Sequence, residues 1–228
     1  MGYELPVSNT GLGAGTYEYR IRNQGRCGSC WAFSAVATLE RQYFVRNGVQ
    51  INLSQQLLVD CSSADKGCAG GFPTRAFSYV AASGIQNAAS YPYIATQSVC
   101  NRQADKAIWF DNTFTSKIIS YTTTAAINAA NQQITANLGV AAGGKFSSLS
   151  NTDDIYDASF SGECDTVRNH AVNLASAGRD ASNRPWVQLL NSWGTGWGYL
   201  GMKKIYPCSE TKLWGAPHMI MYSTNVSL

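Results

Sequence analysis

Seven cysteines in a chain of 228 residues constrain the fold more than any other feature of this sequence. That number is too high for idle thiols in a cytosolic protein, and an odd number predicts three disulfides and one free thiol in an oxidising compartment. A zinc site is an alternative, but the only CxxC, formed by Cys27 and Cys30, has no second close pair of ligands. A thioredoxin-like redox pair at these two cysteines stays open at this point.

The composition narrows the functional classes. Hydrophobic residues make up 45% of the chain, which excludes disorder, and 228 residues suffice for one large domain or two lobes around a core. The net charge of +3 is not gathered in a dense basic run, which argues against a nucleic-acid groove. No apolar stretch approaches the roughly 18 residues of a membrane span. We therefore expect a globular protein that binds neither nucleic acid nor membrane.

The first half of the chain has helical periodicity. Apolar residues recur every three or four positions over 30–47, Ser29 is placed to cap this helix, and Gly48 is placed to end it. Further helices are predicted over 54–61 with Ser54 as the cap, over 74–83, and over about 124–138.

The second half changes character. Short apolar or alternating segments bounded by Gly, Pro and Asn predict strands over 170–175, 186–191 and 202–205. Because helices come first and strands follow, the predicted fold class is α+β, with two unlike halves facing each other. A cleft between such halves is a natural place for chemistry.

Cys30 is the candidate nucleophile. It lies in the first turn of the predicted long helix, where unpaired backbone N–H groups and the positive helix end favour a thiolate. A nucleophilic cysteine needs a base, and His170 in a strand-like run is better placed for this than His218 in a loop-like stretch. Asn191 can fix the tautomer of the imidazole, and Trp193 can shield that bond from water. The alternative is that these residues have only structural roles. His170 would then be a core histidine whose hydrogen bonds are satisfied, and 191–198 would be a Gly-rich turn between strands.

Six segments carry motifs that, in this order, resemble those of the papain-like cysteine proteases. Residues 23–34, with the sequence NQGRCGSCWAFS, resemble the nucleophile segment of that family, and residues 191–198 resemble its NSWG-x-x-WG motif. The other four are 53–61 (second helix), 67–73 (substrate-binding loop), 91–93 (YPY turn) and 169–172 (histidine strand). The chain is therefore identified as a member of this family over about 23–201.

The resemblance implies a fold and an activity. The expected fold is papain-like, a single peptidase domain over 1–228 with a helical lobe over about 1–116 and an antiparallel, β-barrel-like lobe over about 117–228. The expected function is that of a cysteine endopeptidase that forms a covalent acyl-enzyme on Cys30. His170 would be the general acid/base, Asn191 would orient it, and Gln24 with the backbone N–H of Cys30 would form the oxyanion hole.

The resemblance also implies binding residues and disulfides. The segment of Gly70 and Gly71 would offer backbone to an extended substrate, and a mostly apolar pocket would prefer Leu, Val or Phe at P2, the second residue before the scissile bond. The expected substrate-binding residues are Gly28, Gly70, Gly71, Phe72, Pro73, Ala171 and Trp193, with Gly143 and Met219 deeper in the pocket. The expected disulfides are Cys27–Cys68, Cys61–Cys100 and Cys164–Cys208.

The partners implied by the resemblance are peptide and protein substrates, an N-terminal propeptide and protein inhibitors of the cystatin type. No cofactor and no metal are expected, and the protein is expected to be a monomer that is secreted or held in a lysosome- or vacuole-like compartment. Asn52 and Asn225 lie in N-glycosylation sequons.

Several positions depart from the family pattern. Leu190 stands where Lys or Arg commonly precedes the Asn-Ser-Trp motif, the segment before Asn23 lacks the usual acidic-Trp-Arg entry, and Cys208 comes early. These departures bear on the third disulfide and the pocket floor but not on the catalytic set. Two other functions compete with the endopeptidase: a transferase in which an amine resolves the acyl-enzyme, and an inactive homologue that acts as a binding protein.

Overall fold

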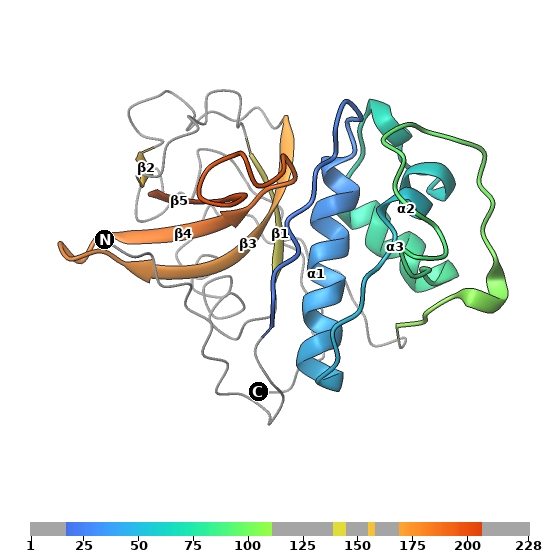
Figure 1. The fold of residues 1–228 in the computed structure, drawn as a ribbon, viewed down its shortest axis with the longest axis horizontal. Helices are drawn as coiled ribbons and strands as arrows, with labels where there is room; N and C mark the ends of the chain where they lie inside the picture. The colour runs from blue at the N-terminus through green and yellow to red at the C-terminus, as the bar shows by residue number, and fades with distance from the viewer. Residues whose placement is uncertain (1–16, 111–138, 145–154, 158–168, 207–228) are drawn as a thin grey trace.

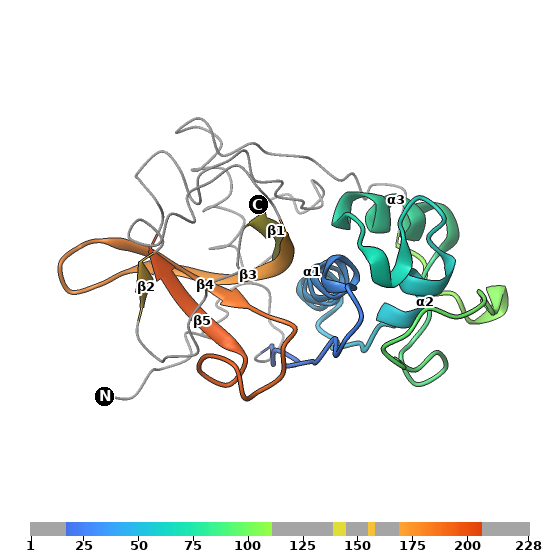
Figure 2. The same ribbon diagram turned by 90° about the horizontal axis from the view of Figure 1, so that it is seen from above.

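The computed structural model describes residues 17–110, 139–144, 155–157 and 169–206. Helices gather on one side and strands on the other, and the segment 17–24 runs between them (Figures 1 and 2). The observed architecture is the predicted α+β arrangement of two unlike lobes. The predicted helix over 124–138, Cys164, Cys208, His218, Met219 and Asn225 lie outside the described residues.

The long helix α1, Cys30–Asn47, forms the centre of the molecule. Its residues are buried on nearly every side because α2 and α3 cover one flank and the sheet covers the other. It ends where Gly48 adopts a left-handed conformation with φ of 66°, and the Gly48 N–H donates to the Phe44 carbonyl. Ser29 stands at the N-cap, but its hydroxyl does not cap the helix; it contacts the Tyr93 hydroxyl instead, at 2.6 Å.

The other helices complete the helical lobe. In α2, Gln55–Cys61, the Ser54 hydroxyl accepts a hydrogen bond from the Leu57 N–H, as a capping serine does. Helix α3, Pro73–Ser83, begins one residue earlier than predicted because the fixed φ of proline suits the first helical position. Two short 3₁₀ helices are η1, Gly67–Ala69, and η2, Ala104–Lys106. Disulfides join Cys27 to Cys68 and Cys61 to Cys100.

The strands form one sheet in the order β1-β3-β4-β5-β2. The central pairs are antiparallel, and β2 joins β5 in parallel. Strand β3 continues four residues beyond the predicted end at 175, because 176–179 pair with β4. The bounds are β1 Val140–Gly144, β2 Tyr156–Asp157, β3 His170–Arg179, β4 Pro185–Leu190 and β5 Met202–Tyr206.

Polar contacts join the two lobes. The Ser34 hydroxyl of α1 donates to the Val172 carbonyl of β3 at 2.6 Å, and Asn173 of β3 donates to Thr38 of α1 at 2.8 Å. These bonds satisfy buried polar groups at the contact between helix and sheet, so they fix the register of β3 against α1.

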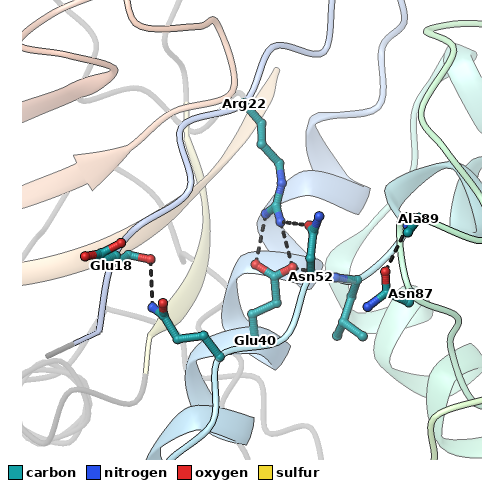
Figure 3. Close-up of polar contacts among 8 residues, drawn as sticks. Glu18, Arg22, Glu40, Asn52, Asn87 and Ala89 are labelled. Atoms are coloured by element: carbon teal, nitrogen blue, oxygen red, sulfur yellow. Dashed lines mark hydrogen bonds and ion pairs between the residues drawn. The ribbon is translucent and has the colours of Figure 1, made fainter. Parts of the chain in front are cut away.

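An ion pair anchors the segment 17–24 to the helical lobe. The Arg22 guanidinium donates two hydrogen bonds to the Glu40 carboxylate, at 3.0 and 2.7 Å, and one to Asn52 (Figure 3). Glu40 is 1% exposed, and it also accepts from the Leu53 N–H at 2.7 Å. The carboxylate is therefore paired and hydrogen-bonded, as a buried charge must be.

Among the residues that the structure describes, no helix combines the length and the apolar character that a bilayer crossing requires.

Candidate active site

A cavity of about 370 Å³ lies between the two lobes, and both lobes line it. The helical lobe contributes the segment around Cys30 and the loop 68–73, and the sheet lobe contributes parts of β1 and the start of β3. The lining residues are Gln24, Gly28, Cys30, Cys68, Ala69, Gly70, Gly71, Phe72, Pro73, Ala142, Gly143, Asn169, His170 and Ala171.

Cys30 is the first residue of α1 and the free cysteine of the described residues. The turn before it is held tightly, because the Gly28 N–H donates to the Cys68 carbonyl at 2.9 Å. A Cβ at position 28 would come within 2.5 Å of that carbonyl oxygen, so glycine is required there. Cys27 is bonded to Cys68, which rules out the redox pair that a CxxC could form.

His170 and Asn191 form a fixed pair at the ends of two neighbouring strands. His170 begins β3, and Asn191 follows the last residue of β4. The distance between His170 Nε2 and Asn191 Oδ1 is 2.7 Å. Asn191 Oδ1 also accepts from the Ser192 N–H at 2.8 Å, which fixes the orientation of the amide. Because Oδ1 can only accept, Nε2 carries the proton and Nδ1 is the basic nitrogen of the neutral ring.

Trp193 covers this pair. Its indole lies against the His170 ring, with 4.6 Å between the ring centroids and 30° between the planes. Trp197 contacts Trp193 edge-on at 5.5 Å, so the cover is itself supported. Trp193 is not among the residues that line the cavity; it packs on the His170 ring and shields that side of the ring from water.

Gln24 is held by both lobes. Its Oε1 accepts from the Ser192 hydroxyl at 2.6 Å, and its Nε2 donates to the Cys27 carbonyl at 2.9 Å. The backbone N–H of Gln24 donates to the Ser192 carbonyl at 2.8 Å. Because Oε1 accepts from Ser192, the NH₂ end of the amide is fixed toward Cys27, the residue three positions before Cys30. Its second N–H remains available to donate to a group bound in the cavity.

Burial opposes charge on both reactive groups. It is the main influence on the Cys30 thiol and raises its pKa, although backbone N–H groups of Ala171 and Trp31 act in the opposite direction. Burial also lowers the pKa of His170, against the hydrogen bond to Asn191, which raises it. Desolvation therefore opposes the stabilisation that the backbone N–H groups give a Cys30 thiolate, so a charge on this sulfur needs a partner of opposite charge.

The structure brings most of the predicted site together. Cys30, His170, Gln24 and the predicted binding residues from Gly28 to Ala171 line one cavity, and Gly143 joins them. Ala142 and Asn169 also line it and were missed. Asn169 could have been predicted from the sequence, because it directly precedes His170. Ala142 could not, because its position at the cavity depends on the pairing of β1 with β3.

No group of three or more potential metal ligands was found within the described parts of the chain.

The comparisons with known proteins point to one family. A family model described as papain family cysteine protease matches residues 14–220. Ananain from Ananas comosus is 34% identical over 186 residues, which are 81% of this chain and 51% of that protein. The chain thus spans about half the length of this relative.

Solved structures agree with this match. Bromelain from Ananas comosus in complex with the E64 inhibitor superposes with a TM-score of 0.76 and 25% identity, over 90% of this chain and 93% of that one. The proform of the ragweed pollen allergen Amb a 11, a cysteine protease, gives a TM-score of 0.77 and 29% identity, over 90% of this chain and 61% of that one.

Proposed function

Because the chain belongs to the papain family of cysteine proteases, we propose that Cys30 is the nucleophile of a peptidase and that His170 is its general acid/base. The observation that carries the proposal is the 2.7 Å contact between His170 Nε2 and Asn191 Oδ1. It commits Nε2 to the asparagine and leaves Nδ1 as the basic nitrogen for Cys30, which lines the same cavity.

The reaction begins with transfer of the Cys30 thiol proton to His170 Nδ1. Burial penalises a thiolate or an imidazolium alone, but the transfer creates both charges together, and their attraction offsets the penalty. The resting site is then a thiolate–imidazolium pair that ionises as a unit. Trp193 supports this pair because it keeps water from the His170–Asn191 bond.

Acylation follows. The Cys30 sulfur attacks the carbonyl carbon of the scissile bond, and the carbonyl oxygen becomes negative. The free N–H of Gln24 Nε2 and the backbone N–H of Cys30 are the donors for that oxygen. His170 then gives its proton to the leaving amine as the C–N bond breaks, and a thioester on Cys30 remains.

Deacylation reverses the roles. Water gives a proton to His170 and attacks the thioester carbonyl, the C–S bond breaks, and the acid product leaves as the thiolate–imidazolium pair is restored. A transferase would use an amine in place of this water.

The cavity supports a preference for apolar side chains at P2. Its lining residues include five that are apolar and carry no charge: Phe72, Pro73, Ala142, Gly143 and Ala171. An apolar side chain gains about 25 cal/mol per Å² buried there, whereas a charged one would lack a partner. Gly28, Gly70 and Gly71 leave the site for P1, the residue next to the scissile bond, open to many side chains.

The proposal extends to partners and compartment. Relatives solved as proforms support an N-terminal propeptide as an intramolecular partner. We also propose a monomer whose cavity between the lobes can receive cystatin-type inhibitors. Two disulfides in the described residues support synthesis into an oxidising compartment, for secretion or for a lysosome- or vacuole-like destination.

Labelling with E-64 tests the proposal. The protein is incubated with E-64, digested and mapped by mass spectrometry, with Cys30→Ala and His170→Ala treated in parallel. We expect one adduct, at Cys30, that depends on His170. Labelling at another cysteine, or equal labelling of His170→Ala, would contradict the assignment. A fully folded protein that neither labels nor cleaves peptides would support the alternative of an inactive binding homologue.

A further inference from the structure

A buried carboxylate lies beneath one wall of the cleft. Asp65, in the turn between α2 and η1, is 9% exposed. Its Oδ1 accepts from the Phe72 N–H at 2.8 Å, and its Oδ2 accepts from the Ser62 hydroxyl at 2.8 Å. Phe72 directly precedes α3, so its N–H has no helical acceptor and depends on Asp65 for one.

The glycine segment of the wall rests on Asp65. A Cβ at Gly71 would come within 2.6 Å of Asp65 Oδ1 and 2.7 Å of the Trp31 ring. The Lys66 N–H donates to the Gly70 carbonyl at 2.9 Å, which closes the loop around the carboxylate. The backbone of Gly71 is therefore packed directly against Asp65 and Trp31, and Gly70 is tied to the same turn through Lys66.

The ring of Phe72 has a separate contact, with Arg75. Phe72 lines the cavity and is 44% exposed, and the Arg75 guanidinium lies over its ring at 4.7 Å from the centroid. Arg75 also donates to the Ala64 carbonyl at 3.0 Å. The backbone of Phe72 thus depends on Asp65, and its ring has a cation–π contact on one face.

Stability alone explains this carboxylate poorly. Burial raises the pKa of Asp65, while the Phe72 N–H, Ser62 and the charge of Arg75 lower it. Burying a carboxylate costs free energy that its hydrogen-bond partners must offset, so a buried carboxylate is weak evidence for a gain in stability. The Asp65 carboxylate instead fixes the position of the Phe72 backbone, because it accepts from the Phe72 N–H.

We propose that Asp65 is a positioning residue for substrate binding: through the Phe72 N–H it holds residues 70–72 in the form that receives the P2 residue. This inference rests on the proposed function, because it assigns a use to the wall of the same cleft. Asp65 does not touch the reacting atoms. Its loss should therefore act on substrate binding rather than on the chemistry of Cys30.

The main test compares four proteins on a fluorogenic peptide with Phe at P2. Asp65→Ala leaves the Phe72 N–H without an acceptor, and we expect KM to rise about tenfold with kcat changed less than about twofold. Asp65→Asn keeps an acceptor oxygen and should restore KM to within about twofold of the starting protein. Asp105→Ala, an exposed carboxylate on η2, is the matched control and should change nothing.

A double-mutant cycle tests the route through Phe72. In the Phe72→Ala background the N–H at position 72 remains, but the ring that Asp65 positions for the P2 residue is gone, so Asp65→Ala should raise KM less than about twofold. Additive effects of the two substitutions would overturn the proposal, and so would an unchanged KM in Asp65→Ala. Alkylation of Cys30 by iodoacetamide, which uses no P2 group, should keep its rate in every folded variant.

The same data separate this inference from the proposed function. If the unmodified protein neither hydrolyses the peptide nor reacts at Cys30, the proposed function fails. If it does both and Asp65→Asn is as impaired as Asp65→Ala, the function stands and the positioning role of the acceptor fails.

Discussion

The two lobes hold their active residues by different means. The helical lobe packs a large core around α1 and is cross-linked by two disulfides, which join residues 41 and 39 positions apart. The sheet lobe relies on its backbone ladder, and its described strands share a small cluster of Ala175, Leu190 and Met202. Cys30, the proposed nucleophile, thus stands in a cross-linked lobe, and His170, the proposed general base, is the first residue of strand β3.

Because of this difference, the position of Cys30 relative to His170 depends on how the two lobes contact each other. Cys30 is fixed within one lobe, and His170 with Asn191 is fixed within the other. Their relative position depends on contacts between the lobes, such as the bond from Ser192 to Gln24 and that from Ser34 to Val172. The segment 17–24 between the lobes is therefore part of the catalytic geometry and not only a connection.

The largest effect should come from removing one reactive group from either lobe. Cys30→Ala and His170→Ala should each lower kcat for peptide hydrolysis by about 10⁶-fold, because the nucleophile and its base act as one unit. The double variant should be no worse than Cys30→Ala alone. Steady-state kinetics with a peptide substrate measure this. Additive losses would mean that the two lobes contribute independently, against the proposed mechanism.

Removing a disulfide should weaken the cross-linked lobe. The paired substitution Cys61→Ser with Cys100→Ser frees a loop of 39 residues and should lower the free energy of unfolding by about 4 kcal/mol. Urea unfolding followed by tryptophan fluorescence measures this loss. A change below about 1 kcal/mol would show that the core around α1, rather than the cross-link, sets the stability of this lobe.

A smaller effect is expected where the lobes share a residue. Gln24→Ala should lower kcat by about 10²-fold with KM nearly unchanged, because one donor to the developing oxyanion is lost. Ser192→Ala removes only the bond that holds Gln24 and should cost less than about tenfold. Measuring both variants on one substrate ranks them. A larger loss of kcat in Ser192→Ala than in Gln24→Ala would mean that the loop after β4, rather than Gln24, makes the main contribution to catalysis.

Local features of this fold could be predicted, and features set by pairing could not. Helical periodicity and the Ser54 cap placed α2 correctly, because both are properties of neighbouring residues. The extension of β3 to Arg179 was missed, because 176–179 are polar or small and become a strand only by pairing with β4. The same holds for the Ser29 hydroxyl, which a tertiary contact to Tyr93 takes from the helix.

In the candidate site too, features of short motifs could be predicted, and features that depend on tertiary contacts could not. Cys30, His170, Asn191 and Gln24 stand in short motifs, so the resemblance could name them. Ala142 reaches the cavity because β1 pairs with the start of β3, where Gly143 is opposite Ala171. Asp65 was missed because nothing in its spacing distinguishes it from a surface carboxylate. The burial that opposes charge on Cys30 and His170 is likewise a property of the assembled lobes.

The central claim is that Cys30 and His170 ionise together across the boundary between the lobes. NMR titration of the His170 ring, in the active protein and in Cys30→Ala, tests it most directly. In Cys30→Ala burial outweighs the hydrogen bond to Asn191, so the pKa of His170 should lie below the usual value of about 6.5 and the ring should be neutral at pH 7. In the active protein the thiolate should keep the ring protonated at pH 7. The same neutral ring at pH 7 in both proteins would contradict the account.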